Sequence, residues 1–201
     1  MLAFTLAVIL LIITPGPAVL SLAGVGASYG GKNATKFLFG LWIGNTLVSV
    51  AVILGFAALV LADPMVRAFL ALVSATYLLY LALRIAFAGA RVAFIQMDAP
   101  GITNGITLQL INPKAYAVHS TLFGGFLIYP DNFIFETCVK LIVSNLFWVL
   151  FHLGWLYAGV FVNNLDLPAK TQRAVNSGMA ISLIVVVAMS VWSISKPSLK
   201  W

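Results

Sequence analysis

The sequence has few charged residues and almost no cysteine. Only 8% of its 201 residues are charged, and five residues are acidic, whereas a soluble domain carries roughly 25% charged residues. This composition cannot supply a water-soluble surface. The single cysteine, Cys138, excludes an internal disulfide and any redox centre that needs two cysteines. Basic residues occur singly, without a run that would follow a phosphate backbone, which argues against a nucleic-acid partner.

Hydrophobic residues dominate instead. They make up 62% of the chain, and the mean hydropathy is +1.08. Apolar runs long enough to cross the roughly 30 Å hydrocarbon core of a bilayer recur along the whole sequence. The net charge of +6 is typical of membrane proteins, in which Lys and Arg gather in cytoplasmic loops. The sequence therefore predicts a multi-pass protein of the cell (inner or plasma) membrane, in contact with the lipid bilayer.

The apolar runs predict an all-α membrane protein with six transmembrane helices. The connecting segments are too short for a soluble domain, so we expect one transmembrane transporter domain over residues 1–201. The fourth helix begins at either Ile102 or Asn112. The predicted helices are residues 2–28, 37–62, 66–87, 102–129 or 112–129, 133–162 and 175–194.

Proline interrupts two of these predicted helices. Pro15 and Pro17 break the first, and Pro113 breaks the fourth. Because proline has no N–H, it leaves the carbonyl four residues earlier without its helical donor, as at Gln109 behind Pro113. A free carbonyl in hydrocarbon is tolerated only against protein or a polar cavity. Each break is therefore either a packing kink or part of a substrate site.

The two breaks also mark an internal repeat. Pro113 lies 98 residues after Pro15, and Asn145 lies 100 residues after Asn45. These marks divide the chain into two three-helix halves, about residues 1–95 and 100–201. Since three is an odd number, the second half must run with inverted topology, as in transporters built from inverted repeats. Broken helices at matching positions of the halves point to a site near the middle of the membrane.

The residues at the breaks suit a small zwitterionic substrate. A capping side chain precedes proline at Thr14-Pro15 and at Asn112-Pro113, which predicts that each pair begins a half-helix with a positive N-terminus for a carboxylate. The freed carbonyls suit an ammonium group. Lys114 opposes the helix dipole, so it either binds the substrate or extends to the membrane interface. The predicted substrate-binding residues are Thr14, Pro15, Gly16, Pro17, Asn45, Asn112, Pro113, Lys114 and Asn145.

Two histidines lie within predicted membrane helices. Ionisable groups inside a membrane are functional candidates by default, and histidine titrates near neutrality. The alternative is a neutral imidazole hydrogen-bonded between helices. The proton-coupling candidates are His119, His152 and Lys114. The sequence has no metal-ligand cluster, phosphate loop or catalytic triad, so we expect neither a cofactor nor an enzyme.

Three short motifs follow one another along the chain. Pro15-Gly16-Pro17 interrupts the first apolar run, Tyr29-Gly30-Gly31-Lys32 forms a predicted turn, and Asn112-Pro113-Lys114-Ala115 lies in the second half. In this order they resemble the LysE/RhtB family of amino-acid exporters. The resemblance implies export of amino acids or their derivatives driven by the proton gradient. Gly124-Gly125 and Asn145 differ from residues that are frequent in the family.

We therefore predict a secondary transporter that exports an amino acid or an amino-acid derivative, with protons as the counter-ion. One alternative is an exporter of metal or other inorganic ions, which would need clustered histidines and carboxylates. Another is a non-transporting membrane subunit in which the breaks serve only helix packing. The oligomeric state is open, with a homodimer as one option.

Overall fold

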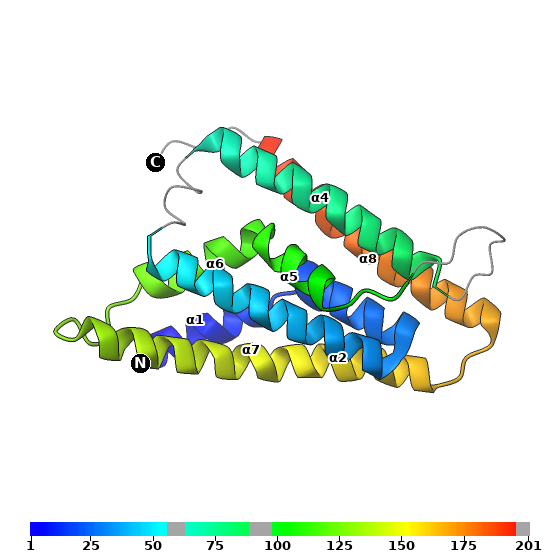
Figure 1. Cartoon of the computed structure of the whole chain (residues 1–201), viewed down its shortest axis with the longest axis horizontal. Coiled ribbons are helices and arrows are strands. Elements are labelled where there is room, and N and C mark those ends of the chain that lie inside the picture. Colours follow the sequence, from blue (N-terminus) through cyan, green and yellow to red (C-terminus); the bar gives the residue numbers. More distant parts are fainter. Residues whose placement is uncertain (56–62, 89–97, 196–201) are drawn as a thin grey trace.

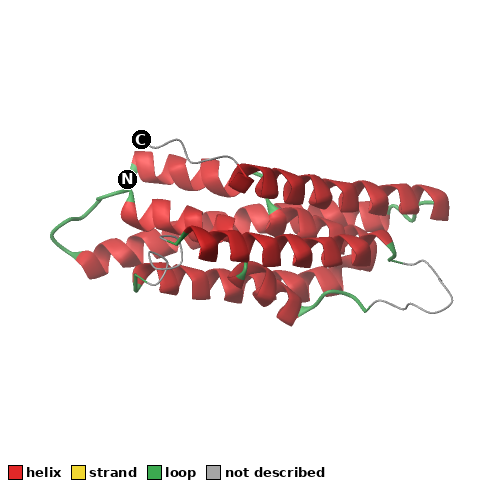
Figure 2. Ribbon diagram, turned by 90° about the horizontal axis from the view of Figure 1, so that it is seen from above, coloured by secondary structure: helices red, strands yellow, loops and turns green. Residues whose placement is uncertain are grey.

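The computed structural model describes residues 1–55, 63–88 and 98–195, and the regular elements in these residues are α-helices (Figures 1 and 2). The predicted all-helical class is thereby confirmed. In Figure 2 the helices run roughly along one common direction. They are α1 (Leu2–Ile13), α2 (Pro17–Ile53), α4 (Pro64–Ala86), α5 (Ile102–Leu110), α6 (Pro113–Gly124), α7 (Phe133–Asn164) and α8 (Ala169–Ser195).

Three segments of the described chain are long and apolar enough to cross a membrane. They are Pro17–Ile53, Ala68–Ala86 and Phe133–Asn164, and α1 is a shorter apolar helix. Large apolar side chains such as those of Leu72 and Leu146 are exposed on these helices, as expected of faces that contact lipid. The end of the predicted second helix, residues 56–62, and the segment between the predicted halves, residues 89–97, lie outside the described residues.

The prediction that Thr14 caps a helix beginning at Pro15 is wrong. Helix α1 ends at Ile13, and α2 begins at Pro17 with Gly16 as its N-cap. Thr14 Oγ1 instead donates a hydrogen bond to the Leu10 carbonyl at 2.6 Å. The reason is the second proline. A residue before proline is driven out of the helical region, so Gly16 is extended, with φ −156°, and α2 begins at Pro17 rather than at Pro15.

The predicted polar turn at residues 29–36 is present, but it is confined to a single residue. Helix α2 continues through this segment, and Gly30 alone within it has non-helical angles, with φ 76° and ψ 175°. Glycine adopts a positive φ without a steric penalty, so one residue is enough to redirect the chain. Figure 1 shows the two parts of α2 at a sharp angle to each other on either side of this kink. The side chain of Asn33 supports it by donating to the Tyr29 carbonyl.

Helix α2 is the centre of the packing and contacts α5 and α7 most extensively, while α4 packs on α8. Its contacts with α5 depend on glycine. A Cβ added at Gly40 would collide with the Ile102 backbone, and one added at Gly105 would collide with Phe37 and Leu41. Small residues of this kind let membrane helices approach closely. This packing holds the α5–α6 break beside the α1–α2 break.

Candidate functional site

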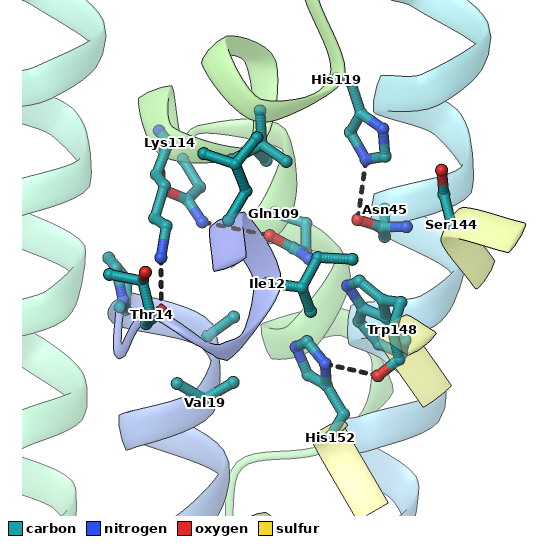
Figure 3. A pocket seen from close by; sticks show the side chains of 17 residues that line it. Ile12, Thr14, Val19, Asn45, Gln109, Lys114, His119, Ser144, Trp148 and His152 are labelled. Atoms are coloured by element: carbon teal, nitrogen blue, oxygen red, sulfur yellow. Dashed lines mark hydrogen bonds between the residues drawn. The ribbon is translucent and has the colours of Figure 1, made fainter. Parts of the chain in front are cut away.

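A cavity of about 60 Å³ lies where the two helix breaks meet (Figure 3). A cavity needs roughly 10–15 Å³ for each water molecule, so this one holds only a few waters. Its walls come from α1, α2, α5, α6 and α7. Of the predicted site residues, the structure places the following in the lining: Thr14, Gly16, Pro17, Asn45, Asn112, Lys114, His119 and His152.

Lys114 joins the two breaks across the cavity. Its Nζ donates a hydrogen bond to the Thr14 carbonyl at 2.5 Å, between residues 100 positions apart in the sequence. Its stem packs against Gly16, because a Cβ added there would lie 3.0 Å from Lys114 Cδ. Figure 3 shows the lysine extended toward the Thr14 backbone. The cation is therefore directed to the first break and lies in the wall of the cavity.

The N-terminus of α2 is open toward the same cavity. Its N-cap, Gly16, has no side chain to accept a hydrogen bond from the first turn. The first N–H groups of a helix have no partner within the helix, and together they carry roughly half a positive charge. Ala18 and Val19, in this first turn, both line the cavity. The helix end and the Lys114 ammonium thus place positive charge on one side of the cavity.

The N-terminus of α6 is closed by its own residues. Asn112 Oδ1 accepts a hydrogen bond from the Lys114 N–H at 3.1 Å. Asn112 Nδ2 donates to Gln109 Oε1 at 3.2 Å, and the Asn112 N–H donates to the Gln109 carbonyl at 3.2 Å. The expectation that Pro113 leaves the Gln109 carbonyl free for a ligand is therefore wrong, because a tighter backbone turn supplies a donor.

His119 is held between α6 and α2 by neutral partners. Its Nε2 lies 3.0 Å from Asn45 Oδ1, and Ser49 Oγ lies 3.2 Å from Nε2 and 3.3 Å from Nδ1. The histidine and Asn45 are both almost fully buried. Since an amide oxygen only accepts hydrogen bonds, Nε2 carries the proton in this contact. These contacts match a neutral imidazole hydrogen-bonded between helices.

His152 has a different environment on α7. Its Nδ1 lies 2.8 Å from the Trp148 carbonyl, and its ring stacks on the Trp148 ring with centroids 3.6 Å apart and planes inclined by 16°. Its Nε2 is buried and has no hydrogen-bond partner among the described residues, and the same holds for Ser144 Oγ. Both side chains line the cavity.

A comparison with protein families identifies the family of the chain. The model of the LysE type translocator family matches residues 9–192. The chain belongs to the LysE family. This LysE-family protein is therefore a membrane protein of a transporter family, as the sequence motifs imply. No curated protein and no solved structure gives a significant match.

Three of the predicted site residues do not line the cavity. Pro15 and Pro113 act on the backbone at the breaks and are absent from the lining. Asn145 is also absent: its Oδ1 accepts a hydrogen bond from Trp42 Nε1 at 3.3 Å, and its Nδ2 donates to the Leu141 carbonyl at 3.0 Å. In this structure Asn145 therefore links α7 to α2 outside the cavity.

Three polar or aromatic side chains of the lining were not predicted from the sequence. They are Gln109 on α5 and Ser144 and Trp148 on α7. Residues four positions apart share one face of a helix, so counting back from His152 would have found Trp148 and Ser144. Pro113 pointed to the backbone carbonyl of Gln109 but not to its side chain, which joins the site because α5 is short and ends beside the break.

The face of α7 that carries Ser144, Trp148 and His152 continues into a buried ion pair. Lys140 Nζ pairs with Glu136 Oε1 and also donates to the carbonyls of Phe123 and Phe126. Glu136 Oε2 accepts from the N–H groups of Ile128 and Tyr129. A buried ion pair needs such additional hydrogen bonds to offset its desolvation. It therefore fastens the end of α6 and the following loop to α7.

Proposed function

We propose that this LysE-family protein is a secondary transporter that exports an amino acid, or an amino-acid derivative, across the cell membrane in exchange for protons. The observation that carries the proposal is the positive wall of the cavity. Lys114 and the uncapped N-terminus of α2 converge there, and such a wall attracts a carboxylate. The likeness of the sequence motifs to amino-acid exporters supplies the substrate class.

The proposed architecture consists of six transmembrane helices in two inverted repeats, within one domain over residues 1–201. The first repeat, about 1–95, begins with the broken pair of α1 and the first part of α2. The second, about 100–201, begins with the broken pair of α5 and α6. In transporters of this design, substrate sites lie between the repeats, and rocking of one repeat against the other opens them alternately to each side.

Three ionisable groups at the cavity are candidates for proton coupling. Lys114, His119 and His152 all line it, and ionisable groups inside a membrane mark proton or substrate pathways. No cofactor enters the proposed cycle. We place the protein in the inner or plasma membrane, and a homodimer remains a prediction from the sequence alone.

The test is transport by purified protein reconstituted into lipid vesicles. With an outward-directed proton gradient, we expect the vesicles to accumulate one or more of the twenty amino acids. The proton gradient is expected to decline as the amino acid enters. A protonophore is expected to abolish accumulation and leave exchange of labelled for unlabelled amino acid. If none of the twenty moves, and divalent cations move instead, the protein is an ion exporter. If nothing moves, the breaks serve packing.

A further inference from the structure

The two histidines of the cavity differ in how their ring nitrogens are used. His119 places Nε2 against Asn45 Oδ1, with Ser49 Oγ near both of its nitrogens. His152 has a partner for Nδ1 only, and its buried Nε2 has none among the residues that the structure describes. Figure 3 shows His152 with one nitrogen bonded to the Trp148 carbonyl and the other turned away from it.

The contact with Trp148 fixes which nitrogen of His152 carries the proton. A backbone carbonyl only accepts hydrogen bonds, so Nδ1 must be the donor in the 2.8 Å contact. The neutral ring then presents a bare lone pair on Nε2. Stacking on the Trp148 ring holds this orientation. A buried acceptor without a partner is destabilising, and in native proteins each such group calls for a ligand or a functional reason.

The charges that face His152 limit what this lone pair accepts. The titratable groups of the cavity lining are Lys114 and His119, both on α6, while the parts of α1, α2 and α5 that line it contribute none. On α7 itself the other polar side chain of the lining is Ser144. No carboxylate is among these residues, so none stabilises a permanent imidazolium. The nitrogen is left for a proton that comes and goes, or for an N–H donor of the substrate.

We propose that Nε2 of His152 binds either a proton or the ammonium group of the substrate, and never both. This inference rests on the proposed function, in which the substrate carboxylate occupies the positive wall formed by Lys114 and α2. On the inner side, the arriving ammonium group donates an N–H to Nε2 after the imidazolium has released its proton to water. On the outer side, a proton binds Nε2 and the substrate leaves. Because the proton and the substrate bind the same atom in turn, the export of substrate is coupled to the entry of a proton.

Two substitutions at this position separate binding from coupling. The amide oxygen of glutamine reaches the place of Nε2 and accepts hydrogen bonds without taking up protons, whereas the shorter asparagine reaches only the place of Nδ1. We expect His152→Gln to lose accumulation driven by the proton gradient and to reduce amino-acid exchange less than His152→Asn does. We expect His152→Asn to lose exchange by about tenfold or more, the typical effect of a hydrogen bond to a charged group.

The probe is whichever of the twenty amino acids the wild-type protein exchanges fastest, and Cys138→Gln, on the exposed side of α7, is the control. Gradient-driven accumulation by His152→Gln at the wild-type level would overturn the inference while leaving the proposed function intact. Failure of the wild type to exchange any amino acid would overturn the proposed function itself.

A second measurement observes the nitrogen directly. The chain contains only two histidines, so ¹⁵N-labelled imidazoles give a simple NMR spectrum in detergent, and His152→Gln identifies the signals of His152. At the pH where His152 is half protonated without ligand, saturating probe amino acid is expected to shift Nε2 to its unprotonated form. An Nε2 that stays half protonated in the presence of saturating probe contradicts the exclusion.

Discussion

The two helix breaks are made of similar residues, but they satisfy their backbone groups in different ways. At the second break, Asn112 caps α6, and its side chain and N–H also bind Gln109. At the first break, Gly16 offers α2 no cap, and the Thr14 carbonyl takes its donor from Lys114 in the other half of the chain.

This difference assigns different roles to the breaks. A buried polar group without a hydrogen-bond partner is costly, so a break that supplies its own partners is complete without a ligand. The second break is of that kind. At the first break, the opening residues of α2 line the cavity without a side-chain cap, and the Thr14 carbonyl depends on a lysine from α6. We therefore propose that the first break binds the ligand and that the second positions Lys114 to serve it.

Among the substitutions at the two breaks, removal of Lys114 is expected to have the largest effect on amino-acid binding. Lys114→Ala takes away the positive charge and the donor of the Thr14 carbonyl, and hydrogen bonds to charged groups contribute about 1.5–3 kcal/mol. We expect amino-acid binding to weaken by roughly ten- to a hundredfold, with the protein still in the membrane. Equilibrium binding to purified protein measures this, with Lys170→Ala, at an exposed lysine, as the control. Equal losses in both variants would mean that the effect is not specific to the cavity.

Adding a cap to the first break is expected to make it resemble the second. Gly16 has extended backbone angles that any residue adopts, so Gly16→Ser introduces a hydroxyl able to accept from the first turn of α2. A serine cap is better than glycine by a few tenths of a kcal/mol. We expect higher thermal stability but weaker binding than in Gly16→Ala, which adds the same Cβ against Lys114 without the hydroxyl. Tighter binding in the serine variant would show that the open helix end does not hold the substrate.

Removing the cap of the second break is expected to affect stability more than binding. Asn112→Ala leaves the Lys114 N–H without its acceptor, and loss of an N-cap typically costs about 1 kcal/mol. Thermal unfolding in detergent is expected to occur at a lower temperature, while the affinity for the amino acid changes less than threefold. A loss of affinity as large as that of Lys114→Ala would make the two breaks equivalent as ligand sites.

The smallest effect is expected at Asn145, outside the cavity. Asn145→Ala removes the bond from Trp42, and hydrogen bonds between membrane helices average about 0.6 kcal/mol. We expect a slight decrease in stability and unchanged binding and transport. Trp42→Phe, which removes the same bond from the other side, is expected to match it. A transport defect confined to Asn145→Ala would return this residue to the substrate site.

Composition and motifs were enough to predict the broad features of the molecule. The scarcity of charge predicted apolar helices, and the motifs from Pro15 to Ala115 predicted the family. The start of α2 was not predicted correctly, because the sequence offers two prolines at the first break and the effect of Pro17 on Gly16 outweighs the capping tendency of Thr14. The turn predicted at residues 29–36 is narrower than expected, because Gly30 alone provides the bend and the polar residues around it are helical.

The features of the site that were not predicted depend on which residues meet in the folded chain. The partner of Lys114 is the Thr14 carbonyl, 100 residues away, and the proline pattern does not mark this carbonyl because the residue four positions later is Ala18. The bare nitrogen of His152 likewise depends on which neighbours its ring meets. The spacing of Ser144, Trp148 and His152 was visible in the sequence, but only the packed structure shows that this face of α7 meets the cavity.

The most direct test of the account compares an amino acid with the amine that lacks its carboxylate, such as L-leucine with isoamylamine or L-alanine with ethylamine. Binding of the pair that the wild type accepts best is measured in the wild type and in Lys114→Ala. We predict that the wild type prefers the amino acid by about tenfold or more and that the variant loses this preference. The same preference in both proteins would contradict the claim that Lys114 and the first break bind the substrate carboxylate.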